Sequence, residues 1–128
     1  MNIKSIVKQI ISLDKEKAVR FIILFGSTAD KKNNHLSDID LAVYYEGTKA
    51  ERFNFRKTIL GHFPNKVDLH IFQDLPLSVQ KEVLKGNPLY YDNYEFMFDQ
   101  CLTTIKDFNS FEKYYNQYLD VLRQGVEA

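Results

Sequence analysis

Residues 21–27 read FIILFGS and residues 37–43 read SDIDLAV, and these two stretches decide the predicted fold. The first lies in a dense β-branched and aromatic run over residues 19–25, which predicts a buried strand that Gly26-Ser27 closes. Residues 38–45 contain most of the second stretch, and their apolar and polar side chains alternate with the period of a strand. The polar segment between the two strands is expected to form a loop.

Helices are expected on both sides of these strands. Apolar residues recur at helical spacing near the N-terminus and predict a first helix that ends near Asp14. A second helix is expected over residues 47–63, followed by a third alternating strand over residues 66–72. The side chains expected to point inward from the second helix are Ala50, Phe53, Leu60 and Phe63.

Beyond the third strand the pattern is mostly helical. Pro76 begins a short helix that Gly86-Asn87-Pro88 stops, and residues 89–91 are expected to be briefly extended. Helical spacing resumes over about residues 93–124, where Asn109-Ser110 could kink the helix or split it in two. The order of elements predicts an α+β fold of α/β-like character, with a small mixed sheet flanked by helices and a helical C-terminal tail.

The composition fits one domain with a packed core. The chain has 128 residues, 45% hydrophobic and 14% aromatic, so residues 1–128 are expected to form a single domain. Seventeen basic residues balance seventeen acidic ones, so strong direct binding to nucleic acid is not expected. Cys101 is the one cysteine and is expected to be a buried structural thiol in a reducing cytoplasm. No apolar run is long enough to span a bilayer, which favours a cytoplasmic protein without a membrane partner.

Two aspartates in the second strand carry the strongest chemical signal. Asp38 and Asp40 stand two positions apart, so their carboxylates share one face of the strand, with α-carbons about 7 Å apart. Two such carboxylates repel one another unless a cation lies between them, and Mg²⁺ prefers oxygen ligands. The alternative is that Ser37-Asp38 caps a turn before the strand begins.

Asp68 repeats this pattern in the third strand, on the face opposite the apolar side chains. If the two strands are neighbours, it would complete a cluster of three carboxylates, which can hold two metal ions for a phosphoryl transfer. Gly26-Ser27 adds a turn where a backbone can approach a phosphate and a hydroxyl can contact it, although such a pair alone also fits an ordinary turn.

These motifs resemble those of the nucleotidyltransferase superfamily related to DNA polymerase β. The resemblance consists of Gly26-Ser27, ten intervening residues, Asp38-Ile39-Asp40, and a later Asp68 in the strand Lys66-Val67-Asp68-Leu69. The minimal branch of this superfamily, the minimal nucleotidyltransferases or MNT proteins, has motifs similar to Leu24-Phe25-Gly26-Ser27 and Ser37-Asp38-Ile39-Asp40-Leu41. The short chain agrees with that branch.

The resemblance implies ATP as substrate, two Mg²⁺ ions with Mn²⁺ as an alternative, and transfer of AMP. Gly26 and Ser27 would hold the phosphates. Asp38 and Asp40 would hold the metal, and Asp68 would bind metal and act as the base. Many MNT proteins are antitoxins of a helical HEPN ribonuclease and transfer AMP to a tyrosine of that toxin, which makes a HEPN-type toxin the expected partner.

The chain departs from the family pattern after the serine. Family members commonly place an arginine and a glycine there, whereas this chain has Thr28-Ala29-Asp30-Lys31-Lys32. Asp30 cannot hold a phosphate, so a contact to the triphosphate is either lost or passed to Lys31 or Lys32, which would act as a point charge. His35 and His70 are interpreted as structural or peripheral, because histidine suits Mg²⁺ poorly.

Three functions remain open at this point. The first is an antitoxin that transfers AMP to a protein tyrosine, the second an adenylyltransferase of a small hydroxylated molecule, and the third a catalytically inactive module that binds a partner. The tail aromatics exceed what a small domain can bury, which favours a protein partner over a free small molecule. We therefore predict a protein adenylyltransferase.

Overall fold

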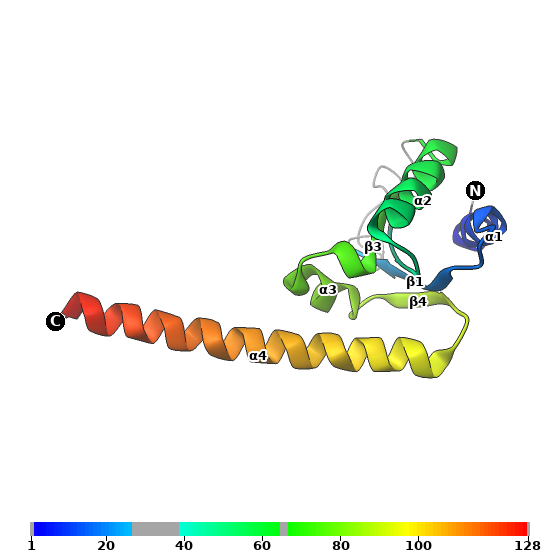
Figure 1. Ribbon diagram of the computed structural model, residues 1–128. Coiled ribbons are helices and arrows are strands. Elements are labelled where there is room, and N and C mark those ends of the chain that lie inside the picture. Colours follow the sequence, from blue (N-terminus) through cyan, green and yellow to red (C-terminus); the bar gives the residue numbers. More distant parts are fainter. Residues whose placement is uncertain (1, 27–38, 65–66, 128) are drawn as a thin grey trace.

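A four-stranded sheet lies between two layers of helices in the computed structural model, which describes residues 2–26, 39–64 and 67–127 (Figure 1). The strand order is β3-β2-β1-β4, with β2 parallel to β3 and β1 antiparallel to both β2 and β4. This mixed sheet with flanking helices confirms the predicted fold class. In chain order the elements are α1 (Ile3–Leu13), β1 (Val19–Phe25), β2 (Ile39–Tyr45), α2 (Lys49–His62), β3 (Val67–Ile71), the 3₁₀ turn η1 (Phe72–Asp74), α3 (Leu77–Val83), β4 (Asn87–Tyr91) and α4 (Tyr94–Glu127).

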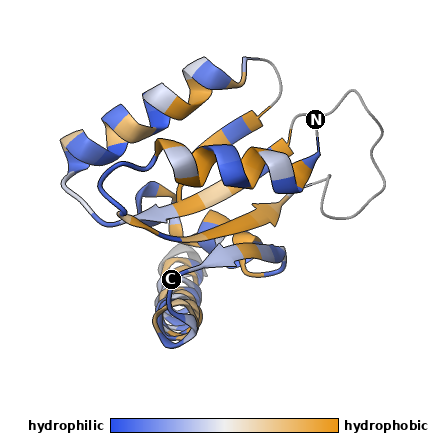
Figure 2. Ribbon diagram, turned by 90° about the vertical axis from the view of Figure 1, so that its right-hand side faces the viewer, coloured by the Kyte–Doolittle hydropathy of each residue, from blue (hydrophilic) through white to orange (hydrophobic). Residues whose placement is uncertain are grey.

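The central strand β1 packs against helices on both of its faces. Ile22 and Leu24 belong to the larger apolar cluster, which α1 and α2 cover, and the intervening Phe21 and Ile23 belong to a second cluster with residues of α3 and α4. Apolar side chains in both phases of the alternation are typical of a strand buried on two sides. Figure 2 shows α1 and α2 on one side of the sheet and the long helix on the other.

Arg20 holds the beginning of α4 against the sheet. Its guanidinium contacts Asp92 at 2.9 Å and Glu46 at 3.2 Å, and lies 3.8 Å from the centre of the Phe96 ring. A planar cation that pairs with carboxylates and stacks on an aromatic face is a use to which arginine is suited. These contacts connect β1, the end of β2 and the first turn of α4.

The predicted strands are confirmed, but the predicted inner face of the second helix is wrong in part. Phe55, Ile59 and Phe63 are buried in the larger cluster, whereas Ala50 is exposed and 62% of Phe53 is accessible. Phe53 lies two residues, or about 200° of helix, from Phe55, so the two rings cannot both face the sheet. Phe55 stacks on Tyr45 of β2 with 4.4 Å between ring centres, so packing on the sheet selects the Phe55 side.

The C-terminal helix is longer than predicted and has no break. It runs from Tyr94 to Glu127 through Asn109-Ser110, and Figure 1 shows its second half extending beyond the sheet. Cys101 is half-buried rather than fully buried, and burial raises the pKa of its thiol. None of the helices in the described ranges is long and apolar enough to cross a membrane.

Candidate active site

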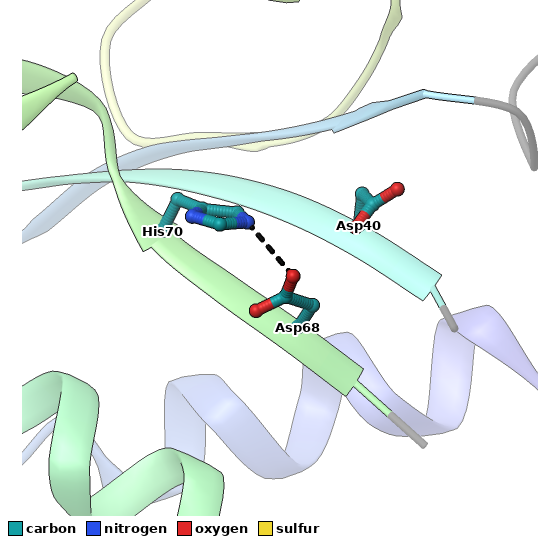
Figure 3. A group of neighbouring side chains, drawn as sticks. All are labelled: Asp40, Asp68 and His70. Atoms are coloured by element: carbon teal, nitrogen blue, oxygen red, sulfur yellow. Dashed lines mark ion pairs between the residues drawn. The ribbon is translucent and has the colours of Figure 1, made fainter. Parts of the chain in front are cut away.

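Three polar side chains meet near the beginning of the parallel strands β2 and β3. Asp40 faces Asp68 directly in the register of the pair, and His70 follows Asp68 by two residues on the same face of β3 (Figure 3). One donor atom from each of the three residues lies within 4.8 Å of the others. Asp40 lies on one strand and Asp68 and His70 on another, and the parallel register of the two strands brings the three side chains together.

The alternation of the strands places this cluster at the border of the second apolar layer. Leu41 and Leu69 point into the larger cluster beneath α1 and α2, so Asp40, Asp68 and His70 face the opposite side. On that side Ile23 and Ala42 form a buried row, and the next row along β1 and β2 pairs Phe25 with Asp40. The carboxylates therefore begin where the cover of α3 and α4 ends, and they are half-buried.

His70 is held by two neighbours. Its Nε2 lies 3.1 Å from Oδ2 of Asp68, and its ring lies edge-on to Phe25 with 5.8 Å between ring centres. The side chain of His70 is 29% exposed and that of Asp68 is 43% exposed, so both remain accessible to a ligand from solvent. His70 thus has a fixed position within the cluster.

Gly26 ends β1 beside Asp40. Its φ is +80°, a conformation that residues with a side chain rarely adopt, and a Cβ at this position would overlap Oδ2 of Asp40. Glycine therefore allows the backbone at the end of β1 to lie against the carboxylate. This arrangement agrees with the interpretation of Gly26 as a close-approach residue, and its contact with a phosphate stays a prediction.

The predicted site residues fall into two groups. Asp40, Asp68 and Gly26 lie together in the structure, as the hypothesis of neighbouring strands required. The predictions for Asp38, Ser27, Lys31 and Lys32, and also that for His35, concern positions outside the described residues.

His70 is the residue of the cluster that sequence reasoning set aside. The signal that could have found it is the one used for Asp38 and Asp40, namely two polar residues two positions apart on a strand face opposite apolar side chains. Asp68 and His70 have this spacing. The preference of Mg²⁺ for oxygen led to its dismissal, although position alone places it beside Asp68.

The cluster has a donor set that fits a divalent cation. Carboxylate oxygens suit Mg²⁺ and Mn²⁺, and imidazole nitrogen suits transition metals. Two ligands at right angles on an ion with bonds of about 2.1 Å lie about 3 Å apart, and the 3.1 Å between His70 and Asp68 is close to this value. A donor atom of Asp40 lies within 4.8 Å of both.

A shallow pocket adjoins the cluster at the outer edge of β3. Its volume is about 380 Å³, and His70 lines it together with Phe53 and Arg56 of α2. The exposed ring of Phe53 therefore forms part of a concave surface rather than of the core. The cluster is open to solvent on this side.

A parallel strand pair with facing aspartates, beside a glycine that ends the central strand, fits the motifs of a nucleotidyltransferase. The family described as polymerase beta nucleotidyltransferase matches residues 8–95, which is more than half of the chain, and the chain belongs to this family. It is therefore a transferase. A Methanocaldococcus jannaschii protein named "Putative protein adenylyltransferase" is 29% identical over 104 residues, which cover 81% of this chain and 75% of the relative.

Solved structures of low sequence identity share the fold. A chain of a toxin–antitoxin complex with AMP-PNP has a TM-score of 0.74 and 17% identity, over 94% of this chain and 98% of that chain. A chain of a tri-AMPylated Shewanella oneidensis HEPN toxin in complex with MNT antitoxin has a TM-score of 0.67 and 18% identity, over 93% of this chain and 97% of that chain.

Proposed function

We propose that this protein uses ATP and a divalent metal to transfer AMP to a tyrosine hydroxyl of a HEPN-type toxin, and that it neutralises the toxin as its cytoplasmic antitoxin. The observation that carries the proposal is the facing pair Asp40 and Asp68 beside Gly26. The membership in the nucleotidyltransferase family and the relative named for protein adenylyltransferase activity support it.

The metal, Mg²⁺ or Mn²⁺ and in two copies, would neutralise the phosphates and polarise the α-phosphoryl group. Asp40 and Asp68 hold it in this proposal, and Asp38 joins them from the residue before β2. Gly26 and Ser27 contact the triphosphate through the turn after β1. The facing positions of Asp40 and Asp68, with Gly26 beside Asp40, support the roles of these three residues. The roles of Asp38 and Ser27 are proposed from the sequence motif alone.

The transfer exchanges one phosphorus–oxygen bond for another. The tyrosine oxygen forms a bond to the α-phosphorus, the bond from that phosphorus to the bridging oxygen breaks, and pyrophosphate leaves. Asp68 accepts the hydroxyl proton as a general base, because its exposed carboxylate can reach an incoming group from solvent. Lys31 and Lys32 would offset the charge of the triphosphate in place of the arginine common in the family.

The C-terminal helix supports a protein as the acceptor. Met97 and Thr104 are buried against the body of the protein, and the same seven-residue step leads to Phe111 and Tyr118, which are exposed. The helix face that packs on the body therefore continues, uncovered, for about 17 Å from Phe111 to Leu122. We call this continuation the distal stripe, which consists of Phe111, Tyr114, Tyr115, Tyr118, Val121 and Leu122.

The distal stripe has the properties of a protein-binding surface. Its six members recur at three- and four-residue spacing, include no charged residue and are rich in tyrosine, a residue enriched at interfaces. We assign the HEPN-type toxin to it because structural neighbours that match 94% and 93% of this chain are chains of toxin–antitoxin complexes. An acceptor bound there would be tethered to the protein that carries the carboxylates.

Intact-mass spectrometry of the toxin tests the proposal. The HEPN-type protein is incubated with this protein, ATP and Mg²⁺, and its mass is compared with that from reactions lacking ATP or containing Asp40→Asn. We expect a gain of one or more AMP units, located on tyrosine by peptide mapping, and a loss of ribonuclease activity. Silencing without a change in mass, by the parent and Asp40→Asn alike, would instead identify an inactive binding module.

A further inference from the structure

We infer that His70 is a nitrogen ligand of the divalent metal, and that this ligand shifts the preference of the site from Mg²⁺ towards Mn²⁺. The inference deepens the proposed function and rests on it in one respect, that a divalent ion occupies the cluster of Asp40 and Asp68. The inference adds an imidazole ligand to a metal site that the sequence motif predicts from carboxylates alone.

The position of the imidazole is the first argument. Nε2 of His70 lies 3.1 Å from Oδ2 of Asp68, the separation expected for two neighbouring ligands of one octahedral ion with bonds of about 2.1 Å. A donor atom of Asp40 lies within 4.8 Å of both. An ion close enough to bind both carboxylates is therefore within reach of the imidazole nitrogen without a change in the backbone.

The support of the ring is the second argument. The edge-on contact with Phe25 and the two-residue step from Asp68 keep the imidazole on the site face of β3. A ligand fixed by packing loses little side-chain freedom on binding. As a ligand, Nε2 is unprotonated and the ring proton is on Nδ1, so the contact with Asp68 becomes a contact between two donors on the same ion.

The chemistry of the donor set decides the metal. Mg²⁺ takes oxygen ligands almost exclusively and gives up water reluctantly, whereas imidazole binds transition metals readily. Mn²⁺ accepts both carboxylate and imidazole. A site with two carboxylates and one imidazole therefore favours Mn²⁺ over Mg²⁺ more strongly than a site of carboxylates alone.

Pulsed electron paramagnetic resonance of bound Mn²⁺, without nucleotide, tests the inference on the full chain, because a directly bound nitrogen modulates the Mn²⁺ signal. His70→Gln is the main variant: its amide can replace the hydrogen bond to Asp68 but is a poor metal ligand. His62→Gln is the matched control, since His62 is exposed in the last turn of α2 and is absent from the cluster.

We expect the nitrogen modulation in the parent and in His62→Gln, and its loss in His70→Gln. Mn²⁺ affinity, titrated by the signal of free Mn²⁺, should fall about tenfold in His70→Gln, while Mg²⁺ affinity, measured by competition, should change by less than about threefold. Full Mn²⁺ affinity in His70→Gln would reduce His70 to a hydrogen-bonding role and overturn the inference.

The parent spectrum keeps the test decisive even if a variant folds poorly. Bound Mn²⁺ without nitrogen modulation, or modulation that persists in His70→Gln, overturns the assignment of His70 while the metal site stands. Absence of Mn²⁺ binding to the parent, or unchanged binding in Asp40→Asn, would overturn the metal site itself and with it the proposed function.

Discussion

Replacing Gly26 by alanine should destabilise the protein and disturb the site at the same time. The positive φ of +80° costs an alanine about 1–2 kcal/mol. The new Cβ would overlap Oδ2 of Asp40, and relieving such an overlap costs about 1 kcal/mol or more. The free energy of unfolding should therefore fall by about 2–3 kcal/mol, which corresponds to a decrease in Tm of about 10 °C for a domain of this size.

Gly61→Ala is the matched control for this prediction. Gly61 lies in α2, and a Cβ there meets nothing within 4 Å. Alanine at this helical position should raise the free energy of unfolding by about 0.5–1 kcal/mol. Urea denaturation followed by circular dichroism measures both variants, and Mn²⁺ titration reports on the carboxylates. A Gly26→Ala protein with the stability and Mn²⁺ affinity of the parent would refute the packing of this turn against Asp40.

Three further perturbations address the fold, the base and the distal stripe. The carboxylate of Asp14 accepts hydrogen bonds from the backbone N–H groups of Ala18 and Val19 at 3.0 and 2.9 Å. Asp14→Ala should therefore lower the free energy of unfolding, measured by urea denaturation, by about 3 kcal/mol. An unchanged midpoint would show that other acceptors replace the carboxylate. Asp68→Asn should retain most of the ATP affinity while AMP transfer falls by roughly 100-fold, measured under single-turnover conditions; equal rates would exclude a role as base. Truncation after Ser110 removes the distal stripe. Tm should stay within about 3 °C of the parent because few contacts to the body are lost, whereas toxin binding measured by calorimetry should be abolished. Retained binding would place the interface elsewhere.

The sheet could be predicted because its strands carry their own pattern. Alternation over residues 38–45 and 66–72 predicted both β2 and β3 to within a residue at each end. The inner face of α2 could not be predicted in the same way, because Phe53 and Phe55 are both aromatic and lie on different sides of one helix. The stacking of Phe55 on Tyr45 of β2, a contact between residues of different elements, decides between them.

The candidate site shows the same division between local and long-range information. The side-chain chemistry of Asp40 and Asp68 was visible in the sequence, and the step that joined them was an assumption about neighbouring strands. The structure supplies the parallel register that pairs them and the contact of Gly26 with Asp40. The position of His70 was visible too, but its proximity to Asp40 depends on that register and could not be inferred from spacing along one strand.

Radioactive ATP can show whether the group transferred to the toxin is AMP. The protein is incubated with Mg²⁺, the HEPN-type toxin, and ATP that carries radioactive phosphorus at either the α or the γ position, and Asp40→Asn is treated in parallel. We expect label from the α position, and none from the γ position, to become attached to the toxin. A chelator should prevent this attachment, and Asp40→Asn should attach no label. Label attached from the γ position, or equal attachment of the α label by Asp40→Asn, would contradict the proposed transfer of AMP.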